Sequence, residues 1–256
     1  MSDRRAVDAT RRFSDRVANY VRFRPGYPAE VVPLLQGETG LKPEWVVADV
    51  GSGTGISAQL LLRAGCTVHG VEPNREMREA AEALLAGEGR FHSVDAPAEA
   101  TTLADGSLDL VLAAQAFHWF DPPRTRREFT RILRSGGWVV LMWNVRHVDT
   151  TPFLRAYEDL LLAYATDYQQ VRHENVTDDR LAEFFTGGVW AAHALPNAQV
   201  FDWEGLAGRL LSSSYAPALG QPNHEVMMEA LRDIFDEHQV EGKVGFEYET
   251  RVYVGR

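Results

Sequence analysis

The sequence contains almost no lysine and only one cysteine. Its two lysines are Lys42 and Lys243; Lys42 precedes a proline in a polar connection, and neither is placed as a Schiff-base residue. Because Cys66 has no second cysteine to pair with, an intramolecular disulfide is excluded, and a reducing cytoplasm is the simplest expectation for the compartment. We expect Cys66 to be a small buried hydrophobic residue.

Long apolar runs and several chemistry-bearing motifs are also missing. No stretch of about 18 apolar residues occurs, which predicts no membrane-spanning helix. The arginine-rich N-terminus lacks the apolar core of a signal peptide. The histidines form no His-Glu-x-x-His pattern and have no cysteine pair, so we expect no metal site. The sequence has no Gly-x-Ser-x-Gly nucleophile turn and no Walker lysine.

The formal net charge is −10 at pH 7. This acidic balance disfavours a broad phosphate-binding surface, so nucleic acid is not the expected partner, and no membrane partner is expected either. Only the arginine-rich N-terminus keeps a nucleic-acid substrate open. We expect a small-molecule substrate and a protein that is a monomer or a homodimer.

The chain is organised around the stretch Val46–Gly55. A continuous apolar run, typical of a strand buried on both faces, ends in glycines at alternate positions, namely Gly51, Gly53 and Gly55. Residues 56–64 then carry apolar side chains at helical spacing. Strand, glycine turn and helix in this order present backbone N–H groups at a helix N-terminus to a polar ligand, and glycine lets that ligand approach closely.

The glycine spacing indicates which ligand to expect. A dinucleotide fingerprint would need a third glycine at position 56, where the chain has Ile56. Asp49 stands two residues before the first glycine, where an acid suits an ammonium group and would repel a pyrophosphate. The pattern Asp49-x-Gly51-x-Gly53-x-Gly55 resembles the first motif of class I methyltransferases, which use S-adenosylmethionine and release S-adenosylhomocysteine.

This resemblance implies an α/β, Rossmann-like class I methyltransferase fold. Such a fold has a seven-stranded, mostly parallel sheet with an antiparallel last strand, here with an added helical cap. The closing segment, with apolar side chains alternating from residue 245 to 254, resembles the last strand of the family.

An acid at the end of the second predicted strand, Thr67–Glu72, is a further candidate for cofactor binding. The Glu72 carboxylate can accept hydrogen bonds from both ribose hydroxyls. A favourable charge at the start of the next helix is the structural alternative. Asp95 follows the third predicted strand, where the family places an acid or polar group against the adenine amino group. The residues implied in cofactor binding are Asp49, Gly51, Ser52, Gly53, Gly55, Glu72, Pro73, Asp95, Ala96, Gln115 and Ala116.

The segment Gln115–Asp121 follows the fourth predicted strand. Ligands of parallel sheets sit beyond the carboxyl ends of strands, so we expect this segment beside the sulfonium. Its Gln-x-x-His-Trp-Phe pattern resembles a branch of small-molecule methyltransferases that includes trans-aconitate methyltransferase-like proteins. His118 is the candidate general base because histidine titrates near neutral pH, and Trp119 can shield the cation. Simple packing under the next helix is the alternative for both.

Four segments are expected along the chain. Residues 1–40 form an N-terminal helical lid with a helix from Phe13 to Phe23, and residues 41–149 form the cofactor-binding core with a fifth strand at 138–143. Residues 150–190 form a helical cap insertion, and residues 191–256 complete the sheet with strands at 198–203 and 245–254. A packing helix instead of a lid, and core instead of pocket for the aromatic residues of the cap, are the alternatives. Candidate acceptor-binding residues are Tyr20, Arg24, Tyr27, Trp119, Asn144, Arg146 and Tyr215.

These features predict a methyltransferase that acts on a small molecule, with O-methylation of a carboxylate or hydroxyl favoured. A carboxylate acceptor needs no base, and Arg24 or Arg146 could bind it. Two other classes stay open. One is an NAD-dependent oxidoreductase with Glu72 on the ribose, against which the glycine spacing and Asp49 count. The other is a protein that binds S-adenosylmethionine without catalysis.

Overall fold

The fold is taken from a computed structural model that describes residues 17–171, 178–185 and 190–256. The first part of the predicted lid, including residues 13–16 of its helix, lies outside these ranges, as do residues 172–177 and 186–189 of the predicted cap. The remaining part of the predicted N-terminal helix is α2 (Val17–Phe23).

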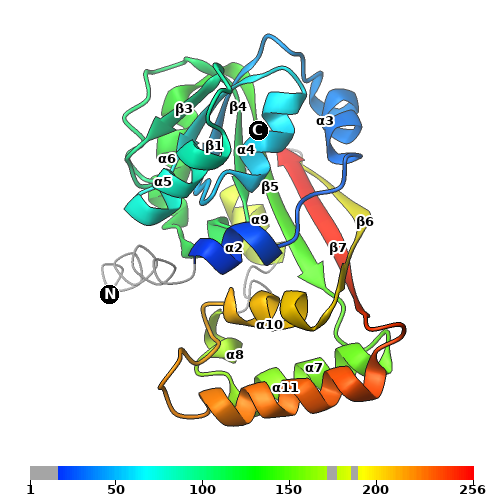
Figure 1. Ribbon diagram of the computed structural model, residues 1–256. Helices are drawn as coiled ribbons and strands as arrows, with labels where there is room; N and C mark the ends of the chain where they lie inside the picture. The colour runs from blue at the N-terminus through cyan, green and yellow to red at the C-terminus, as the bar shows by residue number, and fades with distance from the viewer. Residues whose placement is uncertain (1–16, 172–177, 186–189) are drawn as a thin grey trace.

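The centre of the molecule is a seven-stranded sheet with the order β3-β2-β1-β4-β5-β7-β6. β1, β2, β3, β4 and β5 pair in parallel, whereas β7 runs antiparallel to both of its neighbours. The predicted mostly parallel sheet with an antiparallel last strand is therefore confirmed (Figure 1). The strands are β1 (Val46–Val50), β2 (Thr67–Val71), β3 (Phe91–Val94), β4 (Leu108–Ala114), β5 (Leu133–Arg146), β6 (Ala191–Phe201) and β7 (Val244–Gly255).

Helices cover both faces of this sheet, because the central strands are apolar on both sides. One face packs against α3 and α4 through residues such as Leu35 and Leu61. The other packs against α6 and α9 through residues such as Phe129 and Phe184. The helices of these two layers are α3 (Val31–Thr39), α4 (Ile56–Arg63), α5 (Arg75–Leu84), α6 (Pro122–Ile132) and α9 (Asp178–Phe184).

A third hydrophobic cluster lies beyond the carboxyl ends of the parallel strands. There α7 (Pro152–Tyr164), α10 (Trp203–Leu211) and α11 (His224–His238) pack around the lower end of β7, with the short α8 (Tyr168–Val171) beside them (Figure 1). None of the helices in the described part of the chain is long and apolar enough to cross a membrane. Residues of this helical layer and residues at the strand ends together line one cavity.

The helical layer has a different extent from the predicted insertion at residues 150–190. Two of its helices, α10 and α11, lie beyond residue 190. In contrast, α9 lies within the predicted insertion, but its Leu181 and Phe184 pack into the core of the sheet, as does Phe185 directly after it. Aromatic and leucine residues at helical spacing look alike in both settings, so the sequence pattern did not separate them.

The sixth strand begins earlier than predicted and ends sooner, at Phe201, while Trp203 starts α10. β6 is the edge strand next to β7, and its burial alternates residue by residue, with alanine, proline and valine side chains outward and polar residues among the half-buried ones. The alternation is weak, and Pro196 is of a type that only an edge strand tolerates. For these two reasons the sequence did not predict the first part of this strand. β5 likewise extends beyond residues 138–143 on both sides.

Several contacts hold the N-terminal segment over the gap between the sheet and the helical layer. The Gly26 carbonyl accepts hydrogen bonds from the Asn144 and Asn197 side chains, at 3.1 and 2.9 Å. The Phe23 ring lies against Gly208 of α10, where a Cβ atom would come within 2.1 Å of the ring. The segment after α2 is thus fastened to β5, β6 and α10, which places its side chains over the strand ends.

We expect Gly208→Ala to loosen this segment, because the added methyl group must displace the Phe23 ring. Overpacking of this kind costs about 1–3 kcal/mol of stability. The expected result is a lower melting temperature and severalfold faster trypsin cleavage after Arg22, followed by mass spectrometry. Gly37→Ala on α3 is the matched control, because nothing lies within 4 Å of its added Cβ. Equal cleavage in the two variants would contradict this role for the Gly208 contact.

Candidate active site

The loop between β1 and α4 brings bare backbone to the cavity. Gly51, Gly53 and Gly55 all have positive φ, at 71°, 53° and 85°, a region that other residues rarely adopt. A Cβ atom on Gly51 would lie 2.5 Å from the Cβ of Ala116, so this position has no room for a side chain. A Cβ atom on Gly53 would meet nothing within 4 Å, because this residue faces the cavity. The amides of Gly51, Ser52, Gly53 and Gly55 donate hydrogen bonds within the fold, so what the loop offers is bare backbone that a ligand can approach closely.

The Glu72 carboxylate lies at the end of β2 and is bound to the same loop. Its Oε2 accepts a hydrogen bond from the Gly53 amide at 3.0 Å, and its Oε1 accepts one from the Asn74 amide at 2.8 Å. Burial raises the pKa of Glu72, and these two amides only partly offset that effect. Each oxygen keeps a further lone pair, so the carboxylate can still accept from a ligand on its cavity side.

Asp49 lies beneath the glycine loop and is fully buried. Its Oδ2 accepts a hydrogen bond from the Ser57 hydroxyl at 2.6 Å, while Oδ1 has no hydrogen-bond partner in the described part of the chain. Burial raises the pKa of Asp49 to about 7, a rise that the Ser57 hydroxyl opposes and the nearby Glu72 charge increases. Two carboxyl groups therefore flank the loop, and a cation bound there would be stabilised by both.

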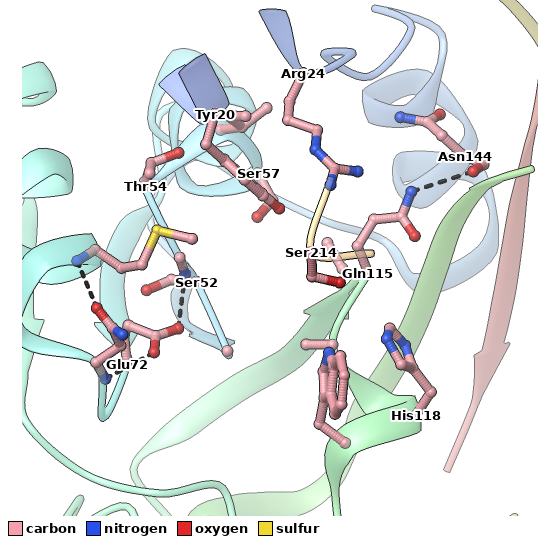
Figure 2. Close-up of a pocket in the computed structure, with 18 of the residues that line it drawn as sticks. Tyr20, Arg24, Ser52, Thr54, Ser57, Glu72, Gln115, His118, Asn144 and Ser214 are labelled. Atoms are coloured by element: carbon pink, nitrogen blue, oxygen red, sulfur yellow. Dashed lines mark hydrogen bonds between the residues drawn. The ribbon is translucent and has the colours of Figure 1, made fainter. Parts of the chain in front are cut away.

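A cavity of about 260 Å³ extends from this loop, past the ends of β4 and β5, to the helical layer. Figure 2 shows Glu72 near the loop residues Ser52 and Thr54, with Gln115 and His118 on the other side of the pocket. The predicted residues that line the cavity are Gly51, Ser52, Gly53, Glu72, Pro73, Gln115, Ala116, His118, Tyr20, Arg24, Tyr27, Trp119, Asn144, Arg146 and Tyr215. Asp49 lies beneath the loop and Gly55 faces Ala81 and Leu85, so neither of them lines the cavity.

Asp95 and Ala96 are not among the lining residues either. The Asp95 carboxylate is exposed and forms an ion pair with Arg78 at 2.8 Å, and Ala96 is buried in the core. The next residues along the chain, 97–99, line the cavity in their place. Glu99 is held there by accepting a hydrogen bond from the Asp121 amide at 2.9 Å. The turn after β3 therefore reaches the cavity two residues later than the sequence suggested.

The end of β4 carries the residues expected beside the reacting atom. Gln115 adopts positive φ, at 56°, and its side chain donates a hydrogen bond to the Asn144 carbonyl at 3.2 Å. The short 3-10 helix η2 (Phe117–Trp119) follows, with Phe117 buried in the core and His118 and Trp119 facing the cavity. The rings of His118 and Trp119 lie 4.8 Å apart. Since η2 turns its Phe117 inward, the histidine and tryptophan are presented to a ligand together.

The far end of the cavity is lined by arginine, tyrosine and serine side chains. Arg146 forms an ion pair with Glu158, whose Oε2 also accepts from the Tyr168 hydroxyl at 2.7 Å. Arg209 of α10 donates to Ser213 Oγ at 3.0 Å and is close to the Tyr248 hydroxyl, at 3.4 Å. Some of the lining residues were not predicted from the sequence, namely Asn74, Met77, Tyr168, Arg209 and Tyr248. One feature of the sequence could have indicated that Arg209 is buried: it stands three residues after the core residue Leu206, on the same face of a helix.

Comparison with known proteins agrees with this geometry. Residues 48–141 match the family model described as a methyltransferase domain. The chain has the Rossmann-like fold of solved methyltransferases. Over 139 residues it is 37% identical to an uncharacterized methyltransferase of Mycobacterium bovis, a match that covers 54% of each chain. The chain thus spans about half the length of the curated relatives that it matches.

Solved structures extend the likeness to most of the chain. A structure from Anaeromyxobacter dehalogenans, described as that of a type II methyltransferase, matches with a TM-score of 0.69 and 26% identity, covering 91% of this chain and 98% of the other. A phosphoethanolamine N-methyltransferase of Haemonchus contortus, in complex with S-adenosylhomocysteine, matches with a TM-score of 0.57 and 16% identity. That match covers 98% of this chain and 58% of the other, and it speaks for the fold alone.

The antiparallel β7 between β5 and β6 also distinguishes the methyltransferase sheet from the all-parallel order of dinucleotide-binding dehydrogenases.

The raised pKa of Asp49 predicts a pH-dependent stability. The Asp49 carboxyl group keeps its proton up to about pH 7 in the folded chain, against 3.8 for an ordinary aspartate. The free energy of unfolding therefore falls as the pH rises from 3.8 to about 7, and it rises as the pH falls through the same window. We expect Asp49→Asn to be more stable than the wild type at pH 8, by roughly 4 kcal/mol at most, with a smaller difference at pH 5. Urea unfolding at the two pH values measures this.

Asp159→Asn is the control for the Asp49 experiment, because it makes the same change of charge at an exposed position of α7. It is expected to follow the wild type at both pH values. A difference for Asp49→Asn that does not change between pH 5 and pH 8 would show that the carboxyl group titrates normally.

Proposed function

We propose that the protein transfers a methyl group from S-adenosylmethionine to an oxygen atom of a small molecule, a carboxylate or a hydroxyl. The observation that carries the proposal is a single continuous cavity. One end is formed by the glycine loop with Glu72, and the other by a cluster of arginine, tyrosine and serine side chains under a layer of helices. A donor site and an acceptor site joined in this way are what a direct transfer requires.

The residues of the first end fit the proposed cofactor. The Glu72 carboxylate can accept hydrogen bonds from the ribose hydroxyls, and the amino-acid part can lie close to the loop backbone at Gly53 because no side chain intervenes. Asp49 adds an acid below the loop, which favours an ammonium group. Met77, Pro97 and Ala98 supply an apolar wall suited to the adenine ring. The cofactor would supply an electrophilic methyl group on a positively charged sulfur.

The residues in the middle of the cavity would align the acceptor. Trp119 offers an aromatic face to the positive charge, and Gln115 is held by its bond to the Asn144 carbonyl. Fixing two reactants in attack geometry can supply about 7–11 kcal/mol of the barrier, so alignment is the main task of the protein. A carboxylate acceptor needs no base, whereas a hydroxyl acceptor would lose its proton to His118.

A small acceptor fits this site better than a nucleic acid. The cavity is roofed by the segment that carries Tyr20, Arg24 and Tyr27, which the bonds at Gly26 fasten to the sheet. A bulky polymer would have to displace that segment. The net charge of −10 also opposes binding of a phosphate backbone.

Isothermal titration calorimetry with S-adenosylhomocysteine and with NAD tests the cofactor assignment. We expect S-adenosylhomocysteine to bind and NAD not to bind. Gly53→Ala should weaken that binding at least tenfold, because its methyl group would occupy the space that the ligand needs. Gly106→Ala is the matched control, with a similar φ of 57° in a turn away from the cavity, so it carries the same backbone strain. Equal losses of affinity in the two variants would contradict the proposed cradle.

A panel of small acceptors, screened for release of S-adenosylhomocysteine, tests the transfer itself. For a hydroxyl acceptor we expect His118→Asn to lower kcat by about 10²–10⁴-fold, the usual contribution of a general base, while affinity for S-adenosylhomocysteine is kept. For a carboxylate acceptor the same variant should retain most of its kcat. His92→Asn, at an exposed position of β3, is the control. Undiminished turnover of a hydroxyl acceptor would remove His118 from the mechanism, and no turnover of any acceptor would leave a binding protein.

A further inference from the structure

The acceptor end of the cavity carries more positive charge than the described residues neutralise. Three arginines line it among the described residues, namely Arg24, Arg146 and Arg209. Arg146 is compensated, because it pairs with the buried carboxylate of Glu158. Neither Arg24 nor Arg209 has a carboxylate within ion-pair distance in the described part of the chain. Two positive charges therefore face one cavity with no carboxylate partner among the residues that the structure describes.

Arg209 is the more deeply placed of the two, at 6% exposure. Its hydrogen bonds go from Nε to Tyr248 Oη and from Nη1 to Ser213 Oγ, both neutral partners, and its Nη2 makes none to a described residue. These contacts orient the guanidinium without cancelling its charge. Burying an uncompensated charge is costly, so a ligand that brings a negative charge would recover that cost.

The neighbours of Arg209 respond to its charge. The pKa of Arg24 is lowered by burial and by the charge of Arg209, which is the effect of two like charges at close range. Burial alone would raise the pKa of Tyr215, yet Arg209, Arg24 and Arg146 outweigh it and lower the pKa. Figure 2 shows the Arg24 side chain reaching into the pocket above Ser214 and Gln115. This end of the cavity is thus at a positive potential, opposite to the end that holds Glu72.

We propose that Arg209, reinforced by the charge of Arg24, binds an anionic group of the methyl acceptor, a carboxylate or a phosphate, and so selects anionic small molecules. The inference rests on the proposed methyl transfer, since it assigns the acceptor half of the same cavity. The planar guanidinium group of an arginine can donate two hydrogen bonds at once to two oxygens of a planar carboxylate or a tetrahedral phosphate. An acceptor with a neutral group at this place would leave the buried charge uncompensated.

Binding of simple anions to the protein saturated with S-adenosylhomocysteine tests the proposal. Because the cofactor site is then already filled, including the place of the ligand's own carboxylate, an added anion can change the melting temperature only by binding at the acceptor end. Malonate and inorganic phosphate are titrated at constant ionic strength, with malonamide as the neutral match of malonate, and the melting temperature is recorded. We expect a saturable rise with malonate or phosphate, whichever class the site takes, and none with malonamide.

Arg209→Gln should raise the apparent dissociation constant of the stabilising anion by about ten- to hundredfold, the loss expected for hydrogen bonds to a charged group. Without an anion the same variant should melt at or above the wild-type temperature, because a buried unpaired charge has been removed. Arg155→Gln, an exposed arginine of α7, is the control and should leave the anion affinity unchanged. A purely structural arginine would instead lower the melting temperature equally with and without anion, which would overturn the proposal.

If Arg209→Gln does not fold, Arg209→Lys takes its place. It keeps the charge and loses the planar fork, so the anion affinity should fall severalfold, and an unchanged affinity contradicts the proposal. Absence of any anion effect on the wild type, with S-adenosylhomocysteine bound, would refute this inference alone. Failure of S-adenosylhomocysteine to bind in calorimetry would instead refute the proposed function.

Discussion

The bond between the Glu72 carboxylate and the Gly53 amide ties the end of β2 to the loop that follows β1. These two strand ends are neighbours in the sheet, paired from Val46↔Thr67 to Val50↔Val71. With the second oxygen on the Asn74 amide, the carboxylate also fixes the start of α5, whose N-cap is Asn74. One side chain thereby sets the relative position of two strand ends and a helix, and the donor half of the cavity takes its shape from it.

The cavity is electrically divided. The end at the glycine loop carries Glu72, with Asp49 below, and the other end carries Arg24 and Arg209, which have no carboxylate partner among the described residues. The ammonium group of the proposed cofactor would lie near Asp49, and the negative group of an anionic acceptor would lie near the guanidinium groups. Under the proposed function the two reactants are drawn to opposite ends, and their reactive parts meet between them at Gln115 and Trp119. The protein then needs no strong acid at the point of transfer.

Much of the donor half could be read from the sequence, because it is built by local chain geometry. Glycines at alternate positions after a buried strand leave few conformations, and Glu72 follows directly from the end of the next strand. Asp95 illustrates the limit, since the turn after β3 runs on to residues 97–99 before it reaches the cavity, while Asp95 pairs with Arg78. A shift of two residues along a loop cannot be fixed by a pattern.

The acceptor half was harder to predict, because its parts come from distant points of the chain. Arg209 and Tyr248 lie on α10 and β7 and meet only when the helical layer folds back against β7. The same long-range packing decided that α9 covers the sheet while α10 and α11 join α7. Spacing identifies which side chains share one helix face, but it does not say which other element that face will touch.

The contact between Gly51 and Ala116 has an evolutionary consequence. Because a Cβ at position 51 would stand 2.5 Å from the Cβ at position 116, two separate strand ends share a volume that holds one methyl group. Neither position can enlarge by a single substitution without pushing the other away from the ligand. Related sequences that keep this sheet register should therefore have only the smallest amino acids at both sites. A larger residue at either site would require a change in how the two loops at positions 51 and 116 pack against each other.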